Sequence, residues 1–147
     1  MVTNMKTTTI REVQLQYGKK TPYGTLTGPE SVAEFLRKVA PNNVQEHVIA
    51  LYLDAAHAPI GYSVVSTGIA NACPVHPREV YQRAVLLGAV AIILAHNHPS
   101  GDCQPSKDDA LITEKIKEAG KTLGIKLLDH VIFTDESFYS FQSNGRI

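Results

Sequence analysis

Apolar residues recur at helical spacing in three segments of the chain. Side chains three and four positions apart lie on one face of an α-helix, so each such stripe predicts a helix with one buried face. The most regular stripe predicts a helix over residues 106–123, ended by Gly124, and two shorter stripes that open on prolines predict helices over 29–40 and 77–88. The stripe of 106–123 consists of Leu111, Ile112, Ile116, Ala119 and Leu123.

Runs of apolar residues predict strands over residues 46–55, 60–68, 89–95, 125–134 and 138–142. Residues 7–17 alternate apolar and polar side chains, with Val13, Leu15 and Tyr17 on one side, and predict a sixth, half-buried strand. The interleaved order predicts a single three-layer α/β domain, in which helices flank a mixed β-sheet. Residues 1–27 are expected to form an N-terminal strand and loop, and residues 28–147 the main domain.

Composition narrows the class of protein. The 147 residues carry 14 basic and 14 acidic side chains, and this balance gives no support to electrostatic binding of nucleic acid. Cys73 and Cys103 belong to no Cys-x-x-Cys pair, so free thiols are expected rather than a cysteine zinc cluster. The start of the chain is polar and no apolar run approaches a membrane span, so we expect a cytoplasmic protein without membrane contact.

Candidate chemistry lies where the predicted strand 89–95 runs into a Pro- and Gly-rich loop and the helix 106–123 begins. Residues two apart on a strand point to the same side, so His96 and His98 can face one point in space. Asp109 lies in the first turn of the helix, and the loop can fold that turn back towards the strand end. Two imidazoles and one carboxylate would leave a tetrahedral zinc ion one open position for water, as in hydrolytic zinc sites.

The same residues also have a purely structural interpretation. Ser106 and Asp109 are spaced as in a capping box, in which Asp109 would accept a backbone N–H and the histidines would be surface residues at a strand end. The motif of two histidines alone does not decide between these interpretations.

The extended pattern resembles the JAMM motif of MPN-domain (JAB-type) metalloproteases, and most closely their bacterial RadC branch. The resemblance begins with His96-Asn97-His98-Pro99 and Pro105-Ser106-Lys107-Asp108-Asp109. It covers residues 28–147 and extends to Leu53-Asp54, Ser66-Thr67-Gly68, His76-Pro77-Arg78-Glu79 and Leu128-Asp129-His130-Val131-Ile132. RadC proteins commonly carry an N-terminal helix-hairpin-helix segment, and the residues before Gly28 show no such pattern, so a short form is expected.

The resemblance implies roles for five residues. His96, His98 and Asp109 would bind zinc, Glu46 would act as the general base, and Ser106 would donate a hydrogen bond to the oxyanion. The implied function is hydrolysis of a peptide or isopeptide bond in a protein or peptide substrate.

Other polar residues receive weaker interpretations. His130 lies in an apolar strand and suits a hydrogen-bonded core histidine, while Asp129 could orient a ligand imidazole from behind. His76 suits a helix cap, and Asp108 points about 100° away from Asp109, so only one of these two should reach a metal. His47 and His57 belong to no pattern of possible partners. Asp102 and Cys103 lie in the loop between the candidate ligands and could approach the site, but solvent exposure in the loop is expected for both.

Two alternative functions remain at this point. Zinc deaminases have a similar overall fold, but they require His-x-Glu and Pro-Cys-x-x-Cys, and both patterns are missing from the sequence. A non-catalytic module, stabilised by metal or associated with DNA repair, would keep the fold and the metal ligands without needing Glu46 as a base.

Overall fold

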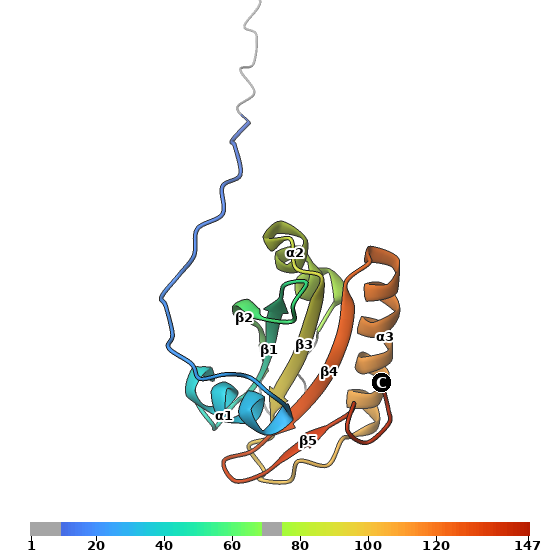
Figure 1. The fold of residues 1–147 in the computed structure, drawn as a ribbon. Coiled ribbons are helices and arrows are strands. Elements are labelled where there is room, and N and C mark those ends of the chain that lie inside the picture. Colours follow the sequence, from blue (N-terminus) through green and yellow to red (C-terminus); the bar gives the residue numbers. More distant parts are fainter. Residues whose placement is uncertain (1–9, 69–74) are drawn as a thin grey trace, which may run out of the picture.

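A computed structural model describes residues 10–68 and 75–147 (Figure 1). Within these ranges the chain forms three helices and five strands. In chain order they are α1 Pro29–Val39, β1 Glu46–Leu53, β2 Pro59–Gly68, α2 Pro77–Leu87, β3 Ala91–Asn97, α3 Lys107–Leu123, β4 Lys126–Phe133 and β5 Phe138–Ser140. The three predicted helices and the five strands after residue 45 are confirmed, with shifts of a few residues at their ends.

The five strands form one mixed sheet in the order β2-β1-β3-β4-β5. β3 and β4 pair in parallel, and the other three pairs are antiparallel. Helix α1 covers one face of the sheet, and α2 and α3 cover the other (Figure 1). The predicted α/β domain with a mixed sheet between helices is therefore confirmed.

Strand β1 shows why the central strands carry an unbroken apolar run, Val48 to Leu53 in β1. Val48, Ala50 and Tyr52 point into the core beneath α2 and α3, while the residues between them point towards α1. Successive side chains of a strand face opposite sides, so a strand buried on both faces cannot alternate with polar residues.

Close approach of α2, α3 and β4 depends on a single glycine. A Cβ atom at Gly120 would overlap the hydroxyl group of Tyr81 in α2 and the carbonyl oxygen of Ile125 before β4. The Tyr81 hydroxyl donates to the carbonyl of Ile116 at 2.8 Å, which ties the two helices together.

The predicted N-terminal strand is wrong over residues 10–17, and its first residues, 7–9, lie outside the described part of the chain. Residues 10–27 form neither helix nor strand, and the first part of this segment extends away from the domain (Figure 1). Val13 and Tyr17 are 81% and 76% exposed. Alternation makes a segment suitable for a strand, but a strand also needs a partner, and none pairs with this one among the described residues.

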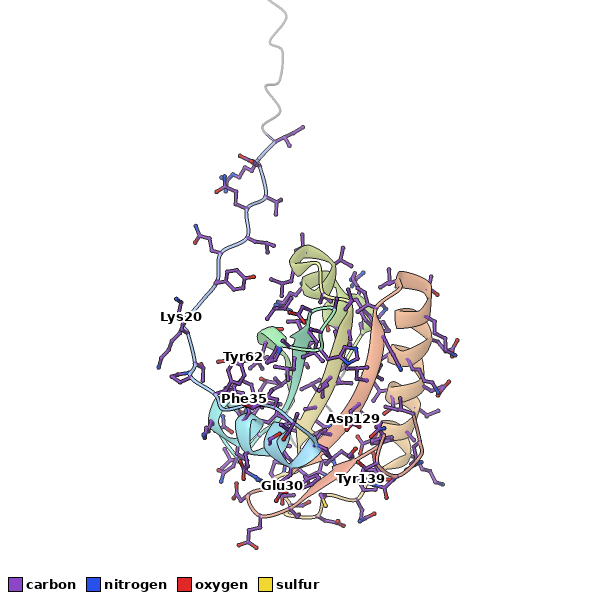
Figure 2. The ribbon with its side chains drawn as sticks, in the orientation of Figure 1. Lys20, Glu30, Phe35, Tyr62, Asp129 and Tyr139 are labelled. Atoms are coloured by element: carbon purple, nitrogen blue, oxygen red, sulfur yellow. The ribbon has the colours of Figure 1, made fainter. Side chains whose placement is uncertain are left out.

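The end of this N-terminal segment nevertheless contacts the domain. Tyr23 packs edge-on against Phe35 of α1, which in turn packs against Tyr62 of β2, as Figure 2 shows for the latter two residues. The Thr21 and Tyr62 hydroxyl groups lie 3.1 Å apart. Among the described helices, none is long and apolar enough to cross a membrane.

Candidate metal centre

The register of the sheet brings Glu46 and the two histidines to one face. β1 and β3 are antiparallel with Val48 opposite His96, so Glu46, two residues earlier on the same face, lies level with His98. The His98 N–H donates to the carbonyl of Phe133 at 3.0 Å, which keeps the chain extended beside β4 for one residue past β3. His98 therefore stays on the face that His96 occupies.

The loop after His98 returns the chain to the same place. Gly101 adopts φ 85°, a left-handed conformation that glycine reaches without strain, and the carbonyl of Asp102 accepts a hydrogen bond from His98 Nδ1 at 2.7 Å. Ser106 then caps α3: its Oγ accepts from the Asp109 N–H at 3.1 Å, and its N–H donates to Asp109 Oδ2 at 2.7 Å. The capping box expected from the sequence is confirmed.

The capping box and the candidate ligand set coexist because a carboxylate has several lone pairs. While Asp109 Oδ2 accepts the Ser106 N–H, Oδ1 lies 3.1 Å from His96 Nε2. His98 Nε2 lies 3.5 Å from Oδ2 and 2.9 Å from His96 Nε2, and Glu46 Oε1 lies 3.9 Å from His96 Nε2. One potential ligand atom from each of the four residues lies within 4.8 Å of the others.

The charges of this cluster depend on one another. Burial alone would raise the pKa of the Asp109 carboxyl, but the imidazoles of His96 and His98 and the Ser106 N–H hold it well below its ordinary value. Asp109 in turn raises the pKa of His98, against its partial burial. In metal-free protein the Asp109 carboxylate therefore favours a proton on the neighbouring His98 imidazole.

The donor set fits a divalent transition metal. Because a carbonyl oxygen can only accept, the Asp102 contact assigns a hydrogen to His98 Nδ1. In the neutral ring that a metal ligand must have, Nε2 is then bare and faces the cluster. A bare imidazole nitrogen, a second imidazole and carboxylate oxygens face one another at 2.9–3.5 Å and can share a cation between them. Nitrogen and oxygen donors of this kind suit zinc. The residues present therefore fit a metal site.

Asn97, between the two histidines, was missed by sequence reasoning. Its side-chain oxygen accepts from the His47 N–H at 2.7 Å, and its amide nitrogen donates to the Gln45 carbonyl at 2.8 Å. These two backbone groups flank Glu46, so the Asn97 amide fixes the start of β1 beside the end of β3. The sequence did offer one signal for Asn97: it is a polar residue in a buried strand, and it points to the face opposite the two candidate ligands.

The structure confirms the expectation for His130 and overturns the one for Asp129. Asp129 Oδ2 accepts from the Ser140 hydroxyl at 2.6 Å and Oδ1 from the Gln142 N–H at 2.9 Å, so its carboxylate holds the C-terminal segment. The prediction that Asp129 orients a ligand imidazole is therefore wrong. His130 is a buried, hydrogen-bonded histidine, as predicted, and it is His130 that contacts His96. Burial lowers the pKa of His130 well below its ordinary value, so its ring is neutral at pH 7.

The remaining candidates lie away from the cluster. His76 caps α2 by accepting from the Arg78 N–H at 3.1 Å, as predicted, and Asp108 is exposed. His57 lies in the exposed turn between β1 and β2 with φ 59°. His47 is buried in β1, with Nδ1 2.8 Å from the Thr67 hydroxyl.

The loop between the ligands approaches the cluster through backbone rather than side chains. Asp102 uses its carbonyl on His98, while its carboxylate accepts from the Gln104 N–H. Cys103 is half-buried in the same loop, and Cys73 lies outside the described residues.

Known proteins resemble this chain over most of its length. The family model of the RadC-like JAB domain matches residues 26–146. A UPF0758 protein of Methanococcoides burtonii is 48% identical over 70% of this chain and 45% of its own length. A UPF0758 protein of Methanosarcina mazei is 40% identical over 84% of this chain and 54% of its own. One from Bacillus cereus is 36% identical over 93% and 60%.

The chain thus spans about half the length of the curated relatives it matches. The matched region contains the two histidines after β3, Asp109 in α3 and Glu46 at the start of β1, together with every described helix and strand. The chain belongs to the RadC-like JAB domain family.

Proposed function

We propose that this protein is a zinc-dependent hydrolase that cleaves a peptide or isopeptide bond. The observation that carries the proposal is the cluster itself: three candidate ligands and the separate carboxylate of Glu46 offer atoms within 4.8 Å of one another. Membership of the RadC-like JAB family supports the metal-dependent chemistry.

His96, His98 and Asp109 would hold the ion. Three protein ligands are the usual number in catalytic zinc sites, because one position must stay open for the reacting groups. A zinc ion bound there would supply Lewis acidity, lowering the pKa of a water molecule to about 7 and polarising the substrate carbonyl.

Glu46 would move the proton. Its side chain is 28% exposed, so substrate can reach it, and its Oε1 lies 3.9 Å from His96 Nε2. A carboxylate at this position can take a proton from the attacking water and return it to the leaving amine. The Asn97 amide would assist by fixing the backbone on both sides of Glu46.

Ser106 would stabilise the oxyanion. Its Oγ accepts the Asp109 N–H, a contact that uses a lone pair of the hydroxyl and not its hydrogen. The exposed hydroxyl can therefore donate to a negative oxygen that develops beside Asp109.

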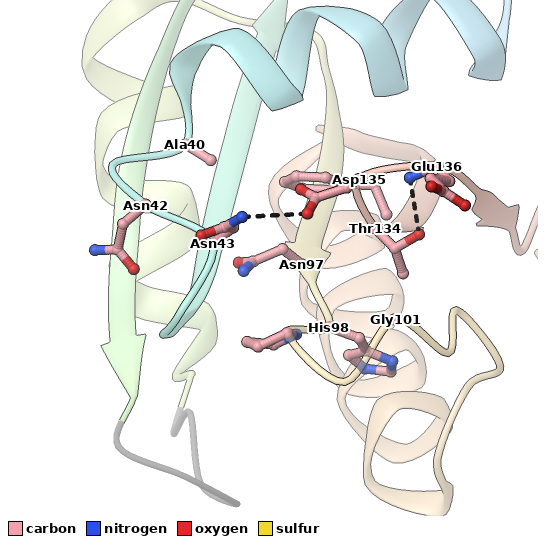
Figure 3. Close-up of a pocket in the computed structure, with 11 residues that line it drawn as sticks. Ala40, Asn42, Asn43, Asn97, His98, Gly101, Thr134, Asp135 and Glu136 are labelled. Carbon is pink, nitrogen blue, oxygen red and sulfur yellow. Dashed lines mark hydrogen bonds between the residues drawn. The ribbon is translucent and has the colours of Figure 1, made fainter.

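A hollow of about 240 Å³ adjoins the cluster and would receive one side of the substrate. Figure 3 shows His98 and Asn97 at its edge, with Ala40, Asn42, Asn43 and residues 134–136 around it. Its lining includes the amides of Asn42 and Asn43 and the carboxylates of Asp135 and Glu136, groups that can hydrogen-bond to a peptide backbone. The substrate that we propose is a protein or a peptide.

A non-catalytic module would make less use of these residues. A metal that only stabilises the fold is normally enclosed by four protein ligands, and it needs neither a base nor an exposed hydroxyl beside it. The equal number of acidic and basic residues gives no support to nucleic-acid binding as the main function.

The proposal can be tested with two substitutions and one control. Zinc content is measured by elemental analysis, and cleavage of a proteome-derived peptide library by mass spectrometry. We expect wild-type protein to retain zinc and cleave, His98→Ala to lose both properties, and Glu46→Gln to retain zinc without cleaving. His57→Asn alters an exposed histidine at a left-handed position that asparagine tolerates, and it should behave as wild type.

Two results would refute the proposal. One is wild-type protein that retains no zinc after exposure to the ion and gel filtration. The other is Glu46→Gln that cleaves as fast as wild type.

A further inference from the structure

A chain of buried polar groups lies directly behind the candidate metal centre. His96 Nδ1 is 2.8 Å from His130 Nε2, and His130 Nδ1 is 2.6 Å from the Thr113 hydroxyl. The Thr113 hydroxyl lies 2.6 Å from the backbone carbonyl of Asp109. The chain thus begins at one candidate ligand, crosses from β3 to β4 and α3, and ends at the backbone of another.

The position of each hydrogen in this chain follows from counting donors. A hydroxyl has one hydrogen and a carbonyl oxygen has none, so the Thr113 hydrogen must lie between the two oxygens that are 2.6 Å apart. Thr113 Oγ1 is then an acceptor for His130 Nδ1–H, which leaves His130 Nε2 bare. His130 Nε2 can therefore accept only from His96 Nδ1–H. In the neutral His96 ring, Nε2 then carries no hydrogen.

Water cannot replace any member of this chain. His96, Thr113 and His130 are 2%, 2% and 1% exposed. The His130 ring also stacks on Phe141, with ring centroids 4.9 Å apart and an interplanar angle of 12°. A buried polar group that loses its partner here stays unpaired, which is costly.

We propose that His130 and Thr113 are positioning residues, which hold His96 in the tautomer whose bare Nε2 faces Glu46, His98 and Asp109. This inference rests on the proposed function in one respect only, that His96 Nε2 binds a metal ion. His96 is thereby fixed from behind by side chains, whereas His98 is fixed by a single backbone carbonyl, that of Asp102. The Asp109 carbonyl at the end of the chain also couples the orientation of His96 to the first turn of α3.

Thr113 offers a matched set of substitutions. Thr113→Val keeps the shape but removes the hydroxyl, Thr113→Ser keeps the hydroxyl, and Tyr81→Phe removes another buried hydroxyl that bonds to a carbonyl of α3, that of Ile116. Zinc affinity is measured by competition with a chromophoric chelator. Loss of such an outer partner typically lowers metal affinity about 10–100-fold. We expect this loss in Thr113→Val, near wild-type affinity in Thr113→Ser, and no change in Tyr81→Phe.

A second measurement uses the same Thr113 variants and needs no metal. In metal-free wild-type protein, the ring nitrogens of His96 are observed by long-range ¹H–¹⁵N NMR, which distinguishes Nδ1–H from Nε2–H. We expect Nδ1–H in wild type and in Thr113→Ser, and a mixture of tautomers in Thr113→Val. A packing role alone would not move this signal.

The outcomes separate this inference from the proposed function. His96 with its hydrogen on Nε2 in metal-free wild type, or Thr113→Val with wild-type zinc affinity, would overturn the role of the chain while leaving the metal site intact. Wild-type protein that shows Nδ1–H on His96 but binds no zinc would instead refute the proposed function.

Discussion

Helices α2 and α3 begin and end in the same way, yet only α3 contributes to the candidate metal centre. Each starts with a capping side chain, His76 or Ser106, and each ends at a glycine with φ near 70°, Gly88 or Gly124. Each also has an acid at its third position, Glu79 in α2 and Asp109 in α3.

The two acids differ in what lies opposite them. Asp109 returns a hydrogen bond to its cap and faces the imidazoles at the end of β3, where it is 8% exposed. Local signals fix where a helix begins, but a neighbouring strand decides whether its first turn also binds something. Substitutions made in pairs on the two helices can test this distinction.

The largest difference is expected between Asp109→Asn and Glu79→Gln. Asp109→Asn replaces the charged proposed ligand by a neutral amide and should lower zinc affinity by more than about 100-fold, the upper limit for an outer partner. Glu79→Gln should leave zinc affinity unchanged. Chelator competition measures both, and equal losses in the two variants would show that an acid at the third helix position is needed for folding rather than for the metal.

The second-largest difference is expected between substitutions of the two N-cap residues, Ser106 and His76. Ser106→Ala removes an N-cap worth about 1 kcal/mol of unfolding free energy, and with it a proposed oxyanion donor worth about 10²–10³ in rate. His76→Ala should cost at most about 1 kcal/mol of stability and leave the rate unchanged. Urea unfolding and cleavage rates measure the two effects, and Ser106→Thr should restore both. A Ser106→Ala protein with the wild-type rate would remove Ser106 from the mechanism.

The C-terminal glycines should behave alike. An L-residue in the left-handed region costs about 1–2 kcal/mol, and a Cβ at Gly88 or Gly124 would meet no atom within 4 Å. Gly88→Ala and Gly124→Ala should therefore lower the free energy of unfolding by similar amounts without changing zinc affinity. A loss of zinc affinity in Gly124→Ala alone would mean that the position of the whole of α3, and not only of its first turn, determines the affinity of the site for zinc.

The smallest expected effect is on pH dependence. Asp109 raises the pKa of His98, so folded metal-free protein keeps a proton that the unfolded chain releases near pH 6.5. This stabilisation is fully present below about pH 6.5 and is lost as pH rises through the folded pKa, by less than about 1.4 kcal/mol per pH unit.

Urea unfolding in EDTA at several pH values measures this effect as the difference between wild type and Asp109→Asn. The difference should shrink as pH rises from 6 to 9, while Glu79→Gln should keep the wild-type pH dependence. A difference that grows with pH would contradict the assignment of the proton to the pair of His98 and Asp109.

The elements and the candidate ligands could be predicted from the sequence because their signals are local. Hydrophobic periodicity defines the helices and strands, and His96, His98 and Asp109 lie within fourteen residues of chain. The strand predicted over 7–17 failed over its described part because alternation carries no information about a pairing partner.

The contacts of His130 and Asn97 could not be predicted because they depend on strand register. A register shift between Ile92 and Ile93 places Leu94 opposite His130, and with it the His130 ring behind His96. If β4 were paired with β3 one residue out of this register, the His130 side chain would face α1 instead. Asp129 would then lie on the face of His96 and could contact it. The sequence does not encode that shift in any local pattern.

A crystal structure of the zinc-loaded protein, with anomalous data at the zinc edge, tests the central claim most directly. We expect one zinc ion about 2.0–2.2 Å from His96 Nε2, His98 Nε2 and a carboxylate oxygen of Asp109, with its remaining position open beside Glu46. Zinc bound elsewhere, or a fourth protein side chain in that position, would contradict the account.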